Sequence, residues 1–172
     1  MNRTATALIF RIVFAAFIAA MAADAGRYLY HLVTGFPLVN WSISGRWFLM
    51  VLGGQIYVPD MSAAPALPHE LIAGRLGYYT IAISFAAVYL FLVERVLKRP
   101  PGLASGLLFG WATLVFPLFL QMPAMGLGIL ASATETPLLI VLRTVVHHTC
   151  FGLVLPVGAA LADRLTARRA VA

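Results

Sequence analysis

The sequence has little charge and only one cysteine. Charged residues make up 10% of the 172 positions and hydrophobic residues 62%, and the mean hydropathy is +0.92. Soluble domains carry about 25% charged residues, so a water-soluble globular domain and a soluble disordered chain are both excluded. The lone thiol, Cys150, forms no internal disulfide and does not indicate a cellular compartment. The composition predicts an integral membrane protein.

Basic residues outnumber acidic residues by 12 to 6, but their placement argues against a nucleic-acid partner. Such a partner needs a contiguous basic surface with aromatic residues that stack on bases, and no stretch of the chain offers one. Most of the basic residues fall instead in three short clusters at the ends of apolar segments. The clusters are Arg3; Arg95, Lys98 and Arg99; and Arg164, Arg168 and Arg169. This distribution indicates membrane topology.

Four apolar segments are long enough to cross a bilayer, which takes about 20 residues in a helix. They run over residues 7–32, 71–97, 103–120 and 138–162. Pro100 and Pro101 separate the second segment from the third, because proline lacks an N–H donor and disfavours helix in the residue before it. The sequence therefore predicts an all-α fold, a polytopic four-helix bundle that forms a single integral membrane domain over residues 1–172.

An even number of spans places all three basic clusters on one side of the membrane. Cytoplasmic loops are enriched in Lys and Arg, so both termini are expected in the cytoplasm. The segment 33–68 and the charge-poor stretch 121–136 then lie on the opposite, outer side. Residues 41–58 are apolar but are interrupted by Arg46 and by Gly53-Gly54. This pattern predicts an additional interfacial or re-entrant helical segment between the first two helices.

The beginning of the chain also resembles a secretory signal peptide. It has Arg3, an apolar core and the small-residue tripeptide Ala20-Met21-Ala22. Cleavage there would leave three spans. Arg11 interrupts the apolar core, and the helical pattern continues to His31 without a break. The first helix is therefore predicted to be retained.

The predicted spans contain ionisable residues, each of which costs roughly 2.5–3.5 kcal/mol at the bilayer centre on insertion scales. Asp24, Arg27 and His31 share one face of the first helix. Arg143 and His147 share a face of the fourth. We expect nearly all ionisable residues that are not basic anchors near the outer end of the bundle. These are Asp24, Arg27, His31, Arg46, Glu70, Arg75, Arg143, His147 and His148.

This set of residues predicts a polar pocket that opens to the outer side and takes a small polar ligand or protons, because water and opposite charges can both reach such a pocket. Two alternatives remain. The residues could form buried ion pairs that only fix helix register, for which Asp24 and Arg27 have a suitable spacing of three. They could also extend to the lipid headgroups.

Metal or haem binding is a further alternative. His147, His148 and His31 are the candidate ligands, and Met122 with Met125 offers thioethers suited to Cu(I). The sequence contains no HExxH, CxxC or CxxCH pattern. No metal site and no cofactor is therefore assigned.

Gly102, Gly106 and Gly110 form a doubled GxxxG pattern in the third span, which lets another helix approach closely. Packing within the chain is the default interpretation. A homo-oligomer or a partner in a membrane complex could use the same face. Pro117 and Pro156 predict kinks in the third and fourth helices.

Several of these residues occur in a pattern that resembles a family of small bacterial inner-membrane proteins, classed as a domain of unknown function. The pattern comprises Asp24, Gly45-Arg46-Trp47, Glu70 with Gly74 and Tyr79, the loop 123–128, Arg143, and His148 with Phe151-Gly152. A histidine often precedes the tyrosine in this family, whereas this chain has Tyr78. The resemblance implies a four-helix protein of the bacterial inner membrane and gives weight to Asp24, Arg46, Glu70 and His148, but it implies no activity.

Three functions are consistent with the sequence. The first is a small transporter or ligand-binding protein with a periplasmic pocket, in which Asp24, Glu70 and His148 handle protons or a polar ligand and Arg46 and Arg143 contact an anionic group. The second is a haem- or metal-dependent membrane redox protein. The third is a non-catalytic accessory subunit of a membrane complex. No catalytic residue is assigned, and a role other than catalysis is favoured.

Overall fold

The computed structural model describes the backbone of residues 3–169 and the side chains of residues 5–167. The side chains of Arg3, Arg168 and Arg169, which belong to the predicted basic clusters, lie outside the described residues. Over residues 3–169 the chain is helical and contains no strand. The predicted all-α fold class is thus confirmed.

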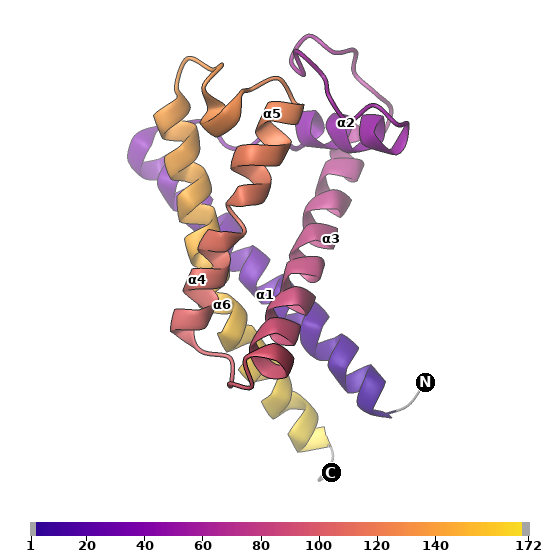
Figure 1. Cartoon of the computed structure of the whole chain (residues 1–172), viewed down its shortest axis with the longest axis vertical. Helices are drawn as coiled ribbons and strands as arrows, with labels where there is room; N and C mark the ends of the chain where they lie inside the picture. Colours follow the sequence, from indigo (N-terminus) through magenta and orange to yellow (C-terminus); the bar gives the residue numbers. More distant parts are fainter. Residues whose placement is uncertain (1–2, 170–172) are drawn as a thin grey trace.

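Four helical segments are long and apolar enough to cross a membrane. They are α1 (Arg3–Thr34); α3 (Glu70–Leu90), continued by the π-helix η1 (Phe91–Val96); α4 (Leu103–Ala112) with the π-helix η2 (Phe116–Gln121) and α5 (Met122–Ala124); and α6 (Pro137–Arg169). Both termini lie at one end of the bundle, here called the terminal end (Figure 1). The opposite end carries the additional helix α2 (Trp41–Leu52) and the 3-10 turn η3 (Ile129–Ala131), and is called the α2 end.

Helix α1 packs on α6 through small residues. Ala15, Ala19 and Ala23 are fully buried, and a Cβ placed on Gly158 of α6 would lie 2.9 Å from the α-carbon of Ala15. Small residues let two membrane helices approach closely enough for extensive van der Waals contact. Helix α1 runs without a break past Ala20-Met21-Ala22. Within this tripeptide Ala20 is fully buried in the core and Met21 is exposed.

Helix α4 packs on α6 through glycines. A Cβ on Gly106 would lie 2.3 Å from the carbonyl oxygen of Gly152, and a Cβ on Gly110 would lie 2.4 Å from that of His148. Gly102 precedes the helix, and its nearest neighbouring atom is 4.0 Å away. Gly106 and Gly110 are therefore occupied by a helix of the same chain, and Gly102 takes no part in the contact.

Helix α2 lies across the beginning of α3, with backbone against backbone (Figure 1). A Cβ on Gly45 would lie 1.7 Å from the carbonyl oxygen of Glu70, and a Cβ on Gly74 would lie 2.1 Å from that of Trp41. Asn40 caps α2, because its side chain accepts a hydrogen bond from the Ser42 amide at 3.0 Å. The two glycines fix where α2 sits above the bundle interior.

The third membrane segment is not one regular helix. Residues 113–114 form a turn between α4 and η2, and the Thr113 hydroxyl donates to the Gly110 carbonyl at 2.7 Å. Pro117 follows in η2, where it has no amide hydrogen for a helical hydrogen bond. Short π-helical segments of this kind are rare and occur frequently at functional sites.

The loops of the α2 end are joined to one another. The Val58 amide donates to the Ala124 carbonyl at 2.8 Å, and the Met61 amide donates to the Met125 carbonyl at 3.3 Å. A small buried cluster of Trp47, Val58, Met61 and Met125 lies beneath them. The segment that follows α2 is thereby attached to the end of the third membrane segment.

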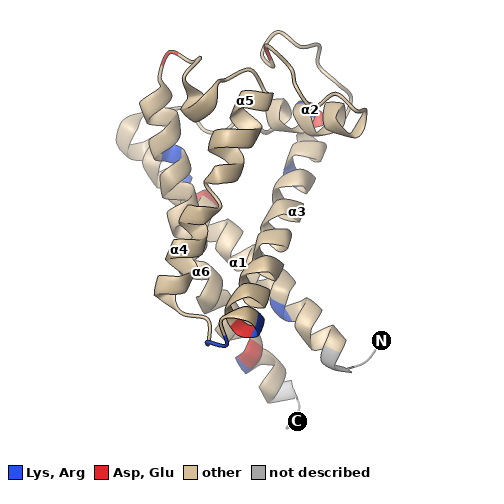
Figure 2. Cartoon of the chain, viewed as in Figure 1, with Lys and Arg blue, Asp and Glu red and all other residues tan. Residues whose placement is uncertain are grey.

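Charged residues lie near both ends of the bundle (Figure 2). At the terminal end, Arg11 of α1 contacts two carboxylates, Glu94 of η1 at 2.6 Å and Asp163 of α6 at 2.9 Å. The sequence interpretation placed nearly all charges other than basic anchors at the outer end, so this ion-pair cluster corrects it. The residues lie far apart in the sequence, and only the packing of three helices brings them together.

Candidate functional site

A cavity of about 230 Å³ lies inside the bundle beneath α2. Helices α1, α2, α3 and α6 contribute to its lining, together with η2 and α5. Most of the lining is apolar, including Trp41, Phe48, Phe85, Phe116, Met122 and Phe151. The cavity is therefore less polar than the pocket that the sequence predicted.

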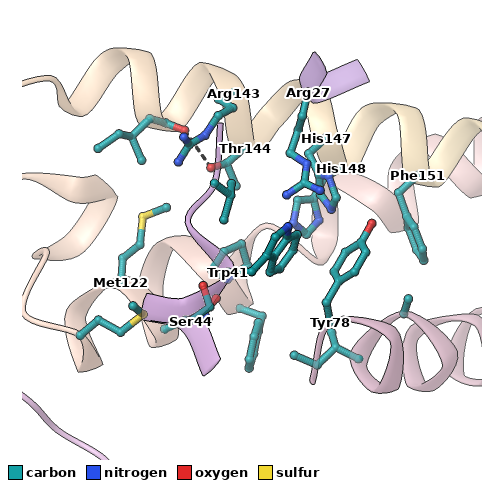
Figure 3. Close-up of a pocket in the computed structure, with 18 of the residues that line it drawn as sticks. Arg27, Trp41, Ser44, Tyr78, Met122, Arg143, Thr144, His147, His148 and Phe151 are labelled. Atoms are coloured by element: carbon teal, nitrogen blue, oxygen red, sulfur yellow. Dashed lines mark hydrogen bonds between the residues drawn. The ribbon is translucent and has the colours of Figure 1, made fainter. Parts of the chain in front are cut away.

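Four of the predicted site residues line this cavity (Figure 3). Arg27 comes from α1, and Arg143, His147 and His148 come from α6. Ser44, Tyr78, Gln121 and Thr144 add neutral polar groups, and no carboxylate belongs to the described lining. The cavity thus combines two guanidinium groups and two imidazoles with aromatic walls.

Arg27 is held from several sides. It forms an ion pair with Asp24 one helical turn earlier, and its guanidinium carbon lies 4.7 Å from the centre of the Trp41 ring. The Tyr78 hydroxyl also donates to Asp24, at 3.1 Å, and it points toward Arg27 and His147 in Figure 3. The positive charge of Arg27 is therefore largely balanced by Asp24.

The positive charge of Arg143 is not balanced in this way. Its Nη1 donates to the carbonyl oxygen of Pro37 at 2.8 Å, and its guanidinium carbon lies 5.0 Å from the centre of the Phe36 ring. Within the described part of the chain, no carboxylate forms an ion pair with it. Carbonyl and ring contacts orient the guanidinium but do not neutralise it.

The two histidines differ in their hydrogen bonding. His148 is buried, and its Nδ1 lies 2.8 Å from the hydroxyl oxygen of Thr113. His147 also lines the cavity, yet its Nδ1 is buried without a hydrogen-bond partner among residues 3–169. Buried polar nitrogens are normally paired, so this atom marks a place where a bound group would be stabilised.

Arg46 and Glu70 lie outside the cavity lining and pair with each other. The Arg46 Nε donates to a Glu70 carboxylate oxygen at 2.8 Å, and the Leu67 amide donates to the same oxygen at 3.1 Å. Hydrogen bonding to this carboxylate raises the pKa of Arg46. The pair joins α2 to the first turn of α3, as the ion-pair interpretation of the sequence describes.

Arg75 and His31 also lie outside the lining. Arg75 is exposed, with its guanidinium carbon 5.0 Å from the centre of the Trp41 ring. The His31 imidazole donates from Nδ1 to the carbonyl of Phe36 at 2.9 Å. Neither residue meets the four charged and imidazole groups of the cavity.

Three residues at the site were missed by the sequence interpretation. Trp41 was covered only as the first residue of the predicted interfacial or re-entrant segment 41–58. Tyr78 was noted only as a departure from a family pattern, and Thr113 was not considered. Of these, Tyr78 carried a usable signal, because it lies two turns into a span and three residues after Arg75, on the same side of the helix. Trp41 and Thr113 reach the site only through the placement of α2 and the break in the third segment.

The histidines do not converge on a metal site. Among the described residues there is no group of three or more His, Cys, Asp or Glu side chains that could hold a metal ion. His31 is engaged with a backbone carbonyl away from His147 and His148. The candidate ligands named from the sequence are therefore not gathered around one centre.

A family model described as "Protein of unknown function (DUF2938)" matches residues 12–162. The chain belongs to this family. The resemblance stated from the sequence is thus confirmed for a family of unknown function with four apolar helices. The DUF2938 match includes every residue that lines the cavity, whereas Arg11 and Asp163 of the terminal ion-pair cluster fall just outside it. No curated protein and no solved structure matches the chain.

Proposed function

We propose that this membrane protein binds a small amphiphilic anion, a carboxylate or a similar group on an apolar body, in the cavity beneath α2. The observation that carries the proposal is Arg143, a guanidinium in an apolar and aromatic cavity with no carboxylate partner in the described structure. Binding of an anion would supply the missing charge.

The energetics favour an anion over a neutral or cationic ligand. A charge in apolar surroundings costs free energy unless it is paired and hydrogen-bonded. Arg143 has one carbonyl partner, so most of its N–H donors remain available, and guanidinium–carboxylate pairs are among the strongest hydrogen-bonded pairs. Arg27 lines the same cavity and is balanced by Asp24. The cavity consequently retains about one unit of uncompensated positive charge.

The volume limits the apolar part of the ligand. An apolar cavity of about 150 Å³ holds a benzene molecule, and this cavity measures about 230 Å³. Drug-sized ligands usually occupy about 300–1,000 Å³. The space is therefore suited to a single ring or a short chain that carries one carboxylate, with Trp41, Phe85 and Phe116 as apolar walls.

We further propose that residues 1–172 form one domain in the bacterial inner membrane, with the cavity in the periplasmic half and both termini in the cytoplasm. Arg95, Lys98, Arg99 and Arg164 are exposed at the terminal end, which is the distribution expected of a cytoplasmic side. The loop after α2 at the other end, residues 53–69, carries one charged residue, Asp60.

Phenylacetate, phenylacetamide and phenethylammonium test the proposal, because they share a ring and differ in charge. We expect the protein in nanodiscs of zwitterionic lipid to bind phenylacetate at least about tenfold more tightly than the other two. Calorimetry measures the affinity, and tryptophan fluorescence provides a second signal through Trp41. A hydrogen bond to a charged group contributes about 1.5–3 kcal/mol, so Arg143→Gln should weaken phenylacetate binding by roughly tenfold or more.

Arg75→Gln is the matched control. It removes an arginine that also lies against an aromatic ring, that of Trp41, but one that is exposed and does not line the cavity. Its affinity for phenylacetate should stay within about threefold of the parent protein. Equal binding of all three probes, binding of none, or an unchanged affinity in Arg143→Gln with its thermal stability intact would each overturn the proposed function.

A further inference from the structure

The cavity contains two of the four histidines of the chain, in contact with each other. The ring centres of His147 and His148 are 5.2 Å apart, and the ring planes are inclined at 70° to each other. The centre of the Tyr78 ring is 5.8 Å from that of His147. The other titratable and charged groups around the pair are Asp24 and Arg27 on α1 and Arg143 on α6. Two imidazoles therefore share the cavity with two guanidiniums, of which Arg27 is paired with Asp24.

The hydrogen bonds of Thr113 determine the tautomer of His148. The Thr113 hydroxyl hydrogen is donated to the Gly110 carbonyl, so the hydroxyl oxygen accepts from His148 Nδ1–H. In the neutral imidazole, Nε2 is then the nitrogen without hydrogen. His148 is consequently oriented by Thr113 and keeps a basic nitrogen.

His147 has the complementary feature, a buried Nδ1 without a hydrogen-bond partner in the part of the chain that the structure describes. A proton on His147 would give both ring nitrogens an N–H and would place a positive charge between Arg27 and Arg143. Without an anion this charge is repelled by both guanidiniums. With a carboxylate in the cavity, the same N–H finds an acceptor and the charge finds a counter-ion.

We infer that the cavity binds its anion together with one proton, which is taken up by the His147–His148 pair. The inference rests on the proposed function and adds what the histidines do there: the carboxylate that pairs with Arg143 also accepts a hydrogen bond from the protonated histidine. Since binding energies are reciprocal, a proton that strengthens anion binding is itself held more tightly when the anion is bound.

The coupling between proton uptake and anion binding predicts how the affinity for the anion changes with pH. Affinity for the anion should rise as the pH falls, by about tenfold per pH unit between the histidine pKa of the free site and the higher pKa of the occupied site. Phenylacetate contributes no protons of its own between pH 6 and 8, because carboxyl groups ionise near pH 4. Proton uptake in this range therefore reports on the protein.

The experiment is calorimetric titration of the parent protein in nanodiscs with phenylacetate at pH 6.5, in buffers of different ionisation enthalpy. The dependence of the heat on the buffer gives the number of protons taken up, and we expect a value near one at the pH where coupling is complete. The pH is varied from 6 to 8 to locate that range. His147→Gln and His148→Gln identify the acceptor. His31→Gln is the matched control, because it removes a histidine outside the cavity lining.

Proton uptake that is retained in His31→Gln and lost when both His147 and His148 are replaced would support the inference. Binding of phenylacetate without proton uptake and with a flat pH profile in the parent protein would overturn it and leave the proposed function standing. Uptake that persists in the double variant would assign the proton to another group, such as the Asp24 carboxylate that is paired with Arg27, and would also overturn it. Absence of binding at every pH would overturn the proposed function itself.

Discussion

Replacement of Gly45 by alanine should force α2 away from α3. The added Cβ would lie 1.7 Å from the Glu70 carbonyl oxygen and 2.4 Å from the Gly74 amide nitrogen, whereas ordinary contact begins at 3.4 Å. Both opposing atoms belong to the backbone, so neither can rotate away. To relieve the closer contact, the two helices must move apart until the 1.7 Å distance reaches 3.4 Å. This movement also lengthens the Arg46–Glu70 contact from 2.8 Å.

Overpacking of this kind costs about 1–3 kcal/mol. For a protein of this size that corresponds to a fall in the thermal midpoint of roughly 2–12 °C. Helix propensity acts in the opposite direction, since alanine is favoured over glycine by about 1 kcal/mol inside a helix. A net loss of stability would therefore be due to the contact with α3. Because Trp41 and Phe48 of α2 line the cavity, phenylacetate affinity should fall as well.

The assay is thermal unfolding in nanodiscs, followed by tryptophan fluorescence, with circular dichroism to verify that helix content is retained. Gly53→Ala is the matched control at the end of the same helix. Its φ of −81° suits alanine, and the nearest atom to its Cβ would be 3.3 Å away. If Gly45→Ala unfolds at the same temperature as Gly53→Ala, the close backbone contact between α2 and α3 is refuted.

Two further predictions concern the α4–α6 contact and the loop after α2. Gly110→Ala should lower the free energy of unfolding by about 1–3 kcal/mol, because its Cβ would meet a backbone oxygen of α6 at 2.4 Å. The control Gly102→Ala should change the free energy of unfolding by less than about 0.5 kcal/mol, and equal thermal midpoints of the two variants would contradict the prediction. In the loop, a neighbouring hydroxyl and two amides donate to Asp60 and lower its pKa. The stability that Asp60 gives the loop is therefore complete above its unfolded pKa of about 3.9 and is lost as the pH falls through the lower folded pKa. Pepsin cleavage of this loop should accelerate over that pH range in the parent protein but not in Asp60→Asn, and the same acceleration in both would refute the assignment.

The fold class could be predicted because its signals are local. Each span appears as a long apolar run, and Pro100-Pro101 divides two of them. The break in the third segment was only partly predictable. Pro117 indicated an irregular helix, but neither the turn at residues 113–114 nor the extent of the π-helical segment η2 has a signal in hydropathy.

The candidate site could be predicted where one helix supplied the residues. Helical spacing put Arg27 on the same face as Asp24, and Arg143 on the same face as His147. Arg46 and Glu70 were assigned to the same pocket because topology placed them at the same end. They are instead satisfied by each other, since α2 crosses α3 where Gly45 meets Gly74. A contact that depends on the absence of two side chains leaves little trace in hydropathy.

The aromatic walls could not be predicted for a related reason. Phe85 and Phe116 come from different segments and meet at a centre-to-centre distance of 6.3 Å. On a sequence so rich in apolar residues, a phenylalanine that faces a cavity has no pattern that distinguishes it from one that faces lipid. Only the arrangement of the helices separates the two.

The two attachments of the α2 end have a mechanical consequence. Helix α2 is fixed to α3 at Gly45, and the chain beyond it is fixed to the third membrane segment through Val58 and Met61. If the bundle widens between these two segments, the short linker between the two attachments must change its conformation. This linker begins with Gly53-Gly54, where Gly54 has a φ of +89°. The glycine pair that interrupts the apolar run is thus the part of this linker whose backbone dihedral angles can change at the least steric cost while both attachments hold.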